Sequence, residues 1–243
     1  QALEVITEKN ALPFMTGTIC THRCMNKCTR NYYEEAVQIR ATKLVAAERG
    51  YDALMAGLKA PAPADSGTKV AVIGGGPTGI SAGFFLGRAG ISCTIFEKAD
   101  VLGGIVRQVI PAFRISNEAI DKDIAMMRKM GVEVKTGAPA PSVAELKKMG
   151  YTHVFFACGA WKAGKLDIPG NVVPVISWLK DLKAGKEVSL GHVAVVGGGN
   201  TAMDAARVAL RAGAKSSTLV YRRTKKYMPA DSEELEMAIA DGV

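Results

Sequence analysis

The sequence has no uninterrupted apolar run of about 18 residues, so it predicts no membrane-spanning helix. Residues 1–4 lack the basic-then-apolar pattern of a secretion signal, and we therefore expect a cytoplasmic protein. The 31 lysines and arginines give a net charge of +8, but they are scattered and form no block of roughly five or six basic residues. Nucleic-acid binding requires such a patch or a dedicated module, so we expect no nucleic-acid partner.

Cysteine is also scarce, and its odd count of 5 argues against a disulfide framework. Cys20, Cys24 and Cys28 are clustered, whereas Cys93 and Cys158 are isolated in apolar, strand-like runs. Clustered thiols in a reducing compartment predict metal ligation.

The remaining composition is that of an ordinary soluble globular chain, with 48% hydrophobic and 22% charged residues. Residues 32–55 carry apolar residues at helical spacing and predict a small helical segment. Residues 59–67 contain two prolines, several alanines and a Ser-Gly pair, which is linker composition. We therefore expect a helical segment and linker over residues 1–65.

Beyond the linker, one pattern occurs twice. Residues 69–98 and residues 192–223 each read as an apolar strand, a glycine loop, a helix rich in small residues and a second apolar strand. This order predicts parallel sheets, so we expect two Rossmann-like α/β nucleotide-binding folds, over residues 66–165 and 166–243. Residues 131–137 and 151–159 supply further strands for the first fold. The second fold has too few elements to cover a sheet, so we expect it to be incomplete and the chain to be a fragment of a longer polypeptide.

The first glycine loop has the spacing of a dinucleotide-binding fingerprint, Gly74-x-Gly76-x-x-Gly79. Gly74 permits the tight turn, Gly76 lets the backbone approach a pyrophosphate, and Gly79 lets the helix pack closely on the strand. Glu97 ends the second strand, where its carboxylate can accept hydrogen bonds from a ribose. The doublet Gly103-Gly104 either approaches a cofactor or makes a turn. The residues predicted to bind the first nucleotide are Gly74, Gly76, Pro77, Thr78, Gly79, Glu97, Lys98, Gly103, Gly104 and Gly159.

The second glycine loop repeats the fingerprint with alanine in its third place. Alignment of the strand ends places Arg222 opposite Glu97, and an arginine suits a 2′-phosphate rather than a bare ribose diol. We hypothesise that the first fold holds FAD and the second holds NADPH, although the arginines could instead be a solvated strand end. The residues predicted to bind the second nucleotide are Gly197, Gly199, Asn200, Thr201, Ala202, Arg222 and Arg223.

The three clustered cysteines are spaced by four, which on a helix would place their thiols in one stripe. Thiolates suit an iron-sulfur cluster or zinc. Three cysteines do not complete a 4Fe-4S cluster, so a fourth ligand would come from elsewhere. Two alternatives stay open: a zinc site that includes His22, and cysteines without a ligand role.

With these motifs, almost the entire chain resembles the small-subunit family of glutamate synthase, and within it the selenate reductase subunits. The supporting strings are LPFMTGTICTHRCMNKCTR, VAVIGGGPTGISAG, GGIVRQVIPAFR, FFACGAW, AVVGGGNTAMDAARVALRAGA and LVYRRTKKYMPA. The family often has a cysteine where this chain has residues 14–16, and an Ala-Thr-Gly where it has Ala157-Cys158-Gly159.

The resemblance implies that electrons pass from NADPH to FAD, then to a 4Fe-4S cluster, and then to a redox partner subunit such as a molybdenum-dependent enzyme. The cofactors would carry the chemistry, so no side chain is predicted to be catalytic. A flavin disulfide reductase is the rival enzyme class, but it needs a CxxC pair that the chain lacks. The remaining alternative is a nucleotide-binding scaffold without turnover.

Overall fold

A computed structural model describes residues 1–64, 67–162, 164 and 166–243, and it divides the chain into two compact units. The first unit contains residues 1–107 and 113–159, and the second contains residues 108–112 and 160–243. The predicted domain boundaries at 65/66 and 165/166 involve residues outside the described ones. No helix among the residues that the structure describes is long and apolar enough to cross a membrane.

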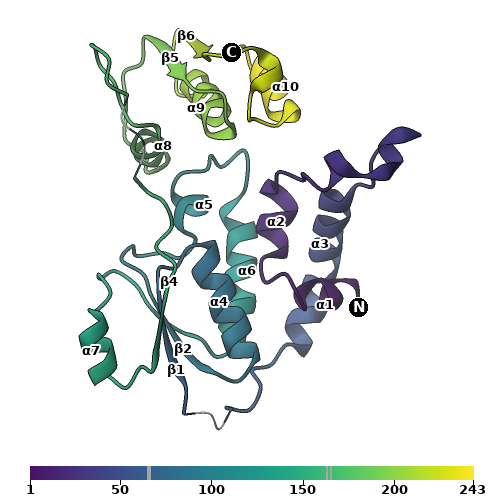
Figure 1. The fold of residues 1–243 in the computed structure, drawn as a ribbon, viewed down its shortest axis with the longest axis vertical. Helices are drawn as coiled ribbons and strands as arrows, with labels where there is room; N and C mark the ends of the chain where they lie inside the picture. The colour runs from purple at the N-terminus through teal and green to yellow at the C-terminus, as the bar shows by residue number, and fades with distance from the viewer. Residues whose placement is uncertain (65–66, 163, 165) are drawn as a thin grey trace. The chain divides into compact units, whose positions relative to one another are not determined.

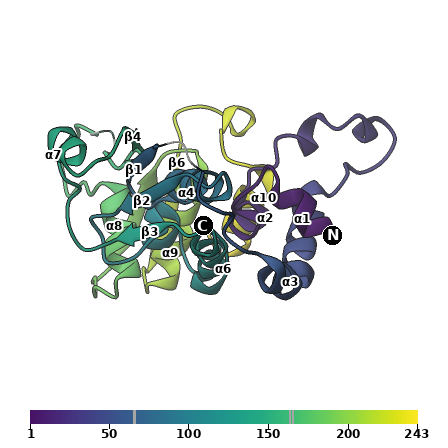
Figure 2. The same cartoon turned by 90° about the horizontal axis from the view of Figure 1, so that it is seen from below.

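The first unit is built on a parallel sheet in the order β3-β2-β1-β4 (Figure 1; all four strands are labelled in Figure 2). Its strands are β1 (Lys69–Ile73), β2 (Ser92–Phe96), β3 (Glu133–Lys135) and β4 (His153–Phe156). The last two strands lie in the segments predicted to supply them. Parallel neighbours must be joined by crossovers, and the first unit uses helices for each of them. These helices are α4 (Pro77–Arg88), α5 (Gly104–Gln108), α6 (Asn117–Lys129) and α7 (Val143–Lys148).

Helices cover both faces of this sheet. On one face, α4 packs against β1, β2 and α6. Glycine in α4 lets this helix lie close to the end of α6. A Cβ at Gly87 would lie only 2.6 Å from the carbonyl oxygen of Met130, the residue that caps α6. On the other face, Leu146 of α7 and Tyr151 pack with Ala71 and Phe96 in a buried cluster. The carboxyl ends of the four strands therefore share one edge, between two covered faces.

The N-terminal helices belong to the same unit. They are α1 (Ala2–Thr7), α2 (Pro13–Ile19) and α3 (Ile39–Gly57), and both views place them side by side (Figures 1 and 2). The sequence predicted a helix over residues 32–55, but α3 begins only at Ile39. Residues 33–38 are not helical.

A single buried carboxylate joins α2 to α6. Asp123 is completely buried, and its two oxygens accept the backbone N–H groups of Phe14 and Met15 at 3.1 and 2.8 Å. These are amides of the first turn of α2, which its own N-cap residue, Leu12, does not satisfy through a side chain. Burial raises the pKa of Asp123 to about 7.

The second unit contains a two-stranded parallel sheet, β5 (His192–Val196) and β6 (Ser216–Val220), joined by α9 (Asn200–Arg211). Two further helices complete it, α8 (Val175–Lys183) and α10 (Ser232–Ala240). Arg207 of α9 is buried and pairs with Asp241 at 2.8 Å and Glu234 at 3.8 Å, which holds α9 to α10. The second fold therefore has the order predicted for it, strand, helix, strand and one more helix.

We predict that Asp123 makes the stability of the first unit depend on pH. The pKa of its carboxyl rises from the ordinary value of 3.8 to about 7 on folding, so its favourable contribution is complete below about pH 4 and is lost as pH rises through 7. The free energy of unfolding of the natural chain, relative to Asp123→Asn, should fall over this window by at most about 1.4 kcal/mol per pH unit. Urea unfolding measured at several pH values tests this.

Asp52→Asn is the matched control, because Asp52 is an exposed aspartate on neighbouring α3. Its unfolding free energy should follow that of the natural chain at every pH. Parallel pH curves for the natural chain and Asp123→Asn would contradict the assignment.

Candidate functional site

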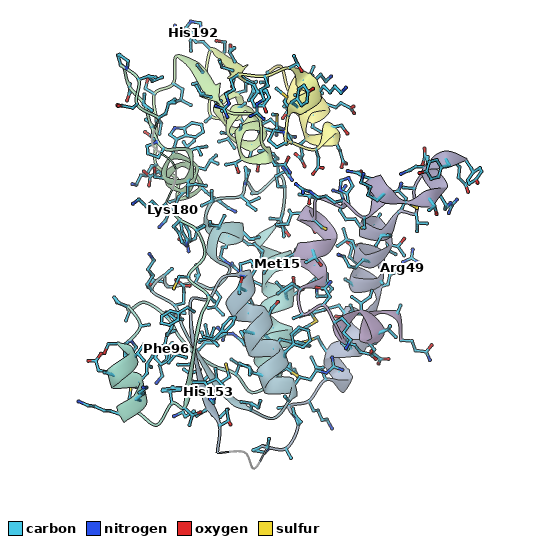
Figure 3. The ribbon with its side chains drawn as sticks, viewed as in Figure 1. Met15, Arg49, Phe96, His153, Lys180 and His192 are labelled. Atoms are coloured by element: carbon cyan, nitrogen blue, oxygen red, sulfur yellow. The ribbon has the colours of Figure 1, made fainter. Side chains whose placement is uncertain are left out.

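The first glycine loop makes a turn that only glycine allows. Gly74 has a φ of +110° and donates its N–H to the carbonyl of Phe96 at 2.8 Å. Figure 3 labels Phe96, the last residue of β2. A Cβ at Gly79 would lie 1.9 Å from the carbonyl oxygen of Gly74, so the third glycine is required where the helix crosses the strand end. These two glycines serve the fold itself.

The middle glycine of each loop is different, because the fold leaves room for a side chain there. Gly76 has φ −76°, and the nearest atom to an added Cβ would be the Cα of Gly104 at 3.7 Å. Gly199 has φ −97°, and the nearest would be Pro229 Cγ at 3.9 Å. Both residues are the N-caps of their helices, α4 and α9. An open space before the first helical amides fits a bound pyrophosphate.

Glu97 holds the first loop in place. Its Oε2 accepts the N–H of Gly75 at 2.6 Å and its Oε1 accepts the N–H of Ala99 at 2.9 Å. Gly75 was not singled out from the sequence, although a Cβ there would lie 2.3 Å from Leu102. The run of three consecutive glycines was the available clue. A hydrogen bond from Glu97 to a ribose stays a prediction.

The doublet Gly103-Gly104 closes on the same loop. Both residues have positive φ, and the N–H of Gly103 donates to the carbonyl of Gly75 at 2.8 Å. A Cβ at Gly104 would approach the Cα of Gly76 to 2.8 Å. The doublet therefore supports the loop, and its approach to a cofactor stays a prediction.

The other residues predicted for the first nucleotide lie around this edge. Pro77 is the first residue of α4, while Thr78 and Lys98 are exposed. Gly159 is also exposed and has φ +70°, just after β4. The end of β4 lies against the loop, because a Cβ at Gly74 would be 2.4 Å from the carbonyl oxygen of Ala157.

The second glycine loop repeats this construction with one substitution. Gly197 has φ +155° and donates its N–H to Val220 at 2.9 Å, while Ala202 is buried in α9 and fills the third place. Thr201 is exposed. The side chain of Asn200 is turned to Asp231, whose N–H it accepts at 2.9 Å.

The structure corrects the alignment of the two folds by one residue. The first glycine of each loop bonds to the last strand residue, which is Phe96 in one fold and Val220 in the other. Tyr221, and not Arg222, is therefore equivalent to Glu97. Tyrosine favours strands, so in the sequence Tyr221 reads as the last strand residue and shifts the alignment. Arg222 and Arg223 follow, and both are exposed.

The three cysteines do not lie on a helix, contrary to the expected stripe. Cys20 caps the C-terminus of α2 in an extended conformation, and Cys24 and Cys28 flank a single turn, η1 (Met25–Lys27). The chain turns at His22, which has φ +37°. Over the described ranges, the structure brings no three His, Cys, Asp or Glu side chains into a metal-binding arrangement.

The environments of the cysteines differ. The backbone N–H groups of Val37 and Arg30 are hydrogen-bonded to the sulfur of Cys28 and lower its pKa. Burial raises the pKa of Cys93 to about 11, so that thiol is a packing residue. His22 Nδ1 lies 3.1 Å from Arg40 and 3.2 Å from the Cys20 carbonyl oxygen, so this nitrogen faces those two groups.

The family model described as pyridine nucleotide-disulphide oxidoreductase matches residues 68–242. The chain belongs to this family. Membership confirms the predicted class, an FAD- and NAD(P)H-dependent oxidoreductase, and the predicted Rossmann-like fold. The Mycobacterium tuberculosis protein FprA, solved in complex with NADPH, has a similar fold, with a TM-score of 0.61 at 21% identity over 72% of this chain and 47% of that chain.

Relatives that match the whole of this chain include the following three. The Escherichia coli (strain K12) protein named "Putative oxidoreductase YgfK" is 44% identical, and the chain spans 24% of it. The beta subunit of the NADPH-Fe(3+) oxidoreductase of Geobacter sulfurreducens (strain DL-1 / KN400) is 34% identical, with 38% spanned. The small chain of glutamate synthase [NADPH] of Escherichia coli (strain K12) is 30% identical, with 56% spanned, which confirms the resemblance stated from the motifs.

We predict that Gly76→Ala folds normally but loses most of its flavin. The added methyl group has space in the protein, and loss of a glycine N-cap costs about 1 kcal/mol or less, but the methyl would occupy the space for the pyrophosphate. Circular dichroism melting and the flavin-to-protein ratio measure the two effects.

Two other glycine variants are the controls for this prediction. Gly79→Ala should fail to fold, because its methyl would collide with the Gly74 carbonyl. Gly57→Ala, at a glycine with nothing within 4 Å of an added Cβ, should keep both stability and flavin. Normal flavin content in Gly76→Ala would show that no ligand approaches this glycine.

Proposed function

We propose that this chain is the electron-entry module of a larger oxidoreductase. NADPH binds at the second glycine loop and FAD at the first, a hydride passes from NADPH to FAD, and single electrons leave through a 4Fe-4S cluster to a partner subunit. The observation that carries this proposal is the matched pair of open helix N-termini at Gly76 and Gly199. When bound, the cofactors supply the redox chemistry, and the chain binds and orients them.

The residues around each loop have distinct roles in this proposal. Around FAD, the N–H groups of the first turn of α4 that follow Pro77, which itself has none, meet the pyrophosphate, and Glu97 keeps the loop in position and faces the ribose. Around NADPH, the amides that follow Gly199 do the same, and the exposed Arg222 and Arg223 provide the positive charge that a 2′-phosphate needs. The other residues predicted from the sequence to bind a nucleotide would lie beside the same two loops, at the carboxyl ends of the strands.

The cysteine segment is the proposed exit for electrons. A thiolate is the form that binds metal, and the lowered pKa of Cys28 favours it. Cys20, Cys24 and Cys28 would ligate one 4Fe-4S cluster together with a ligand from outside these residues. In this proposal residues 1–65 carry the cluster ligands, residues 66–165 bind FAD and residues 166–243 bind NADPH.

Two observations support the proposed partner. Relatives named as a beta subunit and as a small chain support a separate partner subunit. The likeness of the sequence motifs to selenate reductase subunits supports a molybdenum-dependent enzyme as that partner. The chain spans 24% to 56% of these relatives, so the activity of the whole protein is part of the proposal.

The test is the anaerobic visible spectrum of the full natural polypeptide before and after NADPH is added. We expect flavin bands over a broad iron-sulfur absorbance, both bleached by NADPH, with iron and acid-labile sulfide in the protein. Nucleotide binding without bleaching would identify a scaffold. A colourless protein that holds zinc would overturn the electron path, and flavin bleaching with no cluster absorbance would remove the cluster from it.

Cysteine variants localise the cluster. Cys28→Ser should lose the broad absorbance and the acid-labile sulfide of one cluster while it keeps the flavin. Cys93→Ser is the matched control, because Cys93 is buried in strand β2 of the first fold and far from the clustered cysteines in sequence. Its spectrum should match that of the natural chain. Equal sulfide in Cys28→Ser and the natural chain would exclude Cys28 as a ligand.

A further inference from the structure

The segment after β6 folds back onto the second glycine loop. It begins at Tyr221, whose ring fills the space beside Gly198, since a Cβ on that glycine would lie 2.5 Å from the ring. The hydroxyl of Tyr221 donates to the carbonyl of Tyr227 at 2.7 Å. One side chain therefore contacts both the glycine loop and the middle of the segment that follows the strand.

The same segment returns to the glycine loop at its other end. The N–H of Ala230 donates to the carbonyl of Gly198 at 3.0 Å. The N–H of Asp231 donates to Asn200 Oδ1 at 2.9 Å, and Asn200 Nδ2 donates to Asp231 Oδ2 at 3.3 Å. Residues 221–231, which we call the basic loop, are thus attached to the glycine loop at both ends. Asn200, expected to bind the nucleotide, has both polar side-chain atoms committed to this attachment.

The charge of the basic loop is positive where it is exposed. Its four cationic residues are Arg222, Arg223, Lys225 and Lys226, and all four are exposed. No acidic residue lies among them, and the first acid is Asp231 at the far end. The corresponding position of the first fold is Glu97, a carboxylate. The first fold therefore has a carboxylate where the second has Tyr221, and the next residue is exposed and cationic in both folds, Lys98 in the first and Arg222 in the second.

We propose that Tyr221 is the specificity-determining and positioning residue of the second fold, an inference that rests on the proposed NADPH site. Its ring occupies the place from which a carboxylate would accept hydrogen bonds from a bare ribose diol and repel a phosphate. Its hydroxyl holds the basic loop, so that the cationic side chains are presented to a 2′-phosphate without ordering the loop on binding. Selectivity depends on Tyr221 as well as on the two arginines.

The proposal predicts a graded response to two substitutions. Tyr221→Glu should weaken the binding of 2′,5′-ADP by about tenfold or more and leave the binding of 5′-AMP equal or tighter, because a carboxylate then faces the phosphate. Tyr221→Phe keeps the ring on Gly198 and loses only the hydroxyl contact, so it should weaken 2′,5′-ADP binding by a few-fold. Isothermal titration of the full-length holoenzyme with each nucleotide measures both ligands.

Steady-state kinetics supply a second readout. In both variants KM for NADPH should rise while kcat changes little, since Tyr221 acts on binding, and in Tyr221→Glu the preference should move toward NADH. Tyr227→Phe is the matched control, because only the backbone carbonyl of Tyr227 accepts the Tyr221 hydroxyl. It should bind both nucleotides as the natural chain does.

The outcomes separate this inference from the proposed function. If the natural protein binds 2′,5′-ADP no better than 5′-AMP, the NADPH site itself is wrong. A second outcome would overturn the role of Tyr221 alone. In it, the natural protein prefers 2′,5′-ADP, Tyr221→Glu keeps the same ratio of affinities for the two nucleotides, and the Arg222→Ala, Arg223→Ala double variant loses the preference. Selectivity would then lie in the arginines alone. Tyr221→Phe, which preserves the packing, tests the role even if Tyr221→Glu does not fold.

Discussion

The turn between β1 and α4 is the constraint on which the first unit depends. Gly79 lies so close to the carbonyl of Gly74 that no Cβ fits between them, so the helix starts directly over the end of the strand. This places the unpaired amides of the first helical turn at the carboxyl edge of the sheet. Glu97 and Gly103 then hold the two polar backbone atoms of Gly75, its N–H and its carbonyl. The loop is fixed before any ligand binds, which is what a preorganised anion site requires.

The second unit shows how much of this construction can change. Ala202 replaces the third glycine, and Tyr221 replaces the acid that holds the loop in the first fold. The Tyr221 ring contacts Gly198, and the N–H groups of Ala230 and Asp231 are hydrogen-bonded to Gly198 and Asn200. These contacts hold the second loop in place, as the Glu97 carboxylate holds the first. Because the negative charge is gone from that position, the cations that follow the strand can act on a phosphate without a competing carboxylate. In the proposed function, this difference lets the same fold accommodate two different nucleotides.

The parts that the sequence predicted are those that local spacing determines. The glycine loops, the strands that precede them and the small-residue helices follow from residues that are neighbours in the chain. The start of α3 and the placement of the cysteines were not predictable in this way. The residues before Ile39 are not helical although their apolar spacing fits a helix, and a left-handed His22 turns the chain between Cys20 and Cys24. The contact of Asp123 with Phe14 joins residues 109 positions apart, and no local pattern encodes it.

That long-range contact determines where the cysteines lie relative to the first fold. The linker composition of residues 59–67 would allow the N-terminal segment to move away from the sheet, but α2 is capped by Asp123 of α6 and packs on it. Cys20 follows the last residue of α2, a helix about 10 Å long, so its backbone is held at a set distance from α6. The Asp123 carboxylate therefore positions the N-terminal segment on the first fold through its two hydrogen bonds, although its burial makes the fold less stable at neutral pH than at low pH.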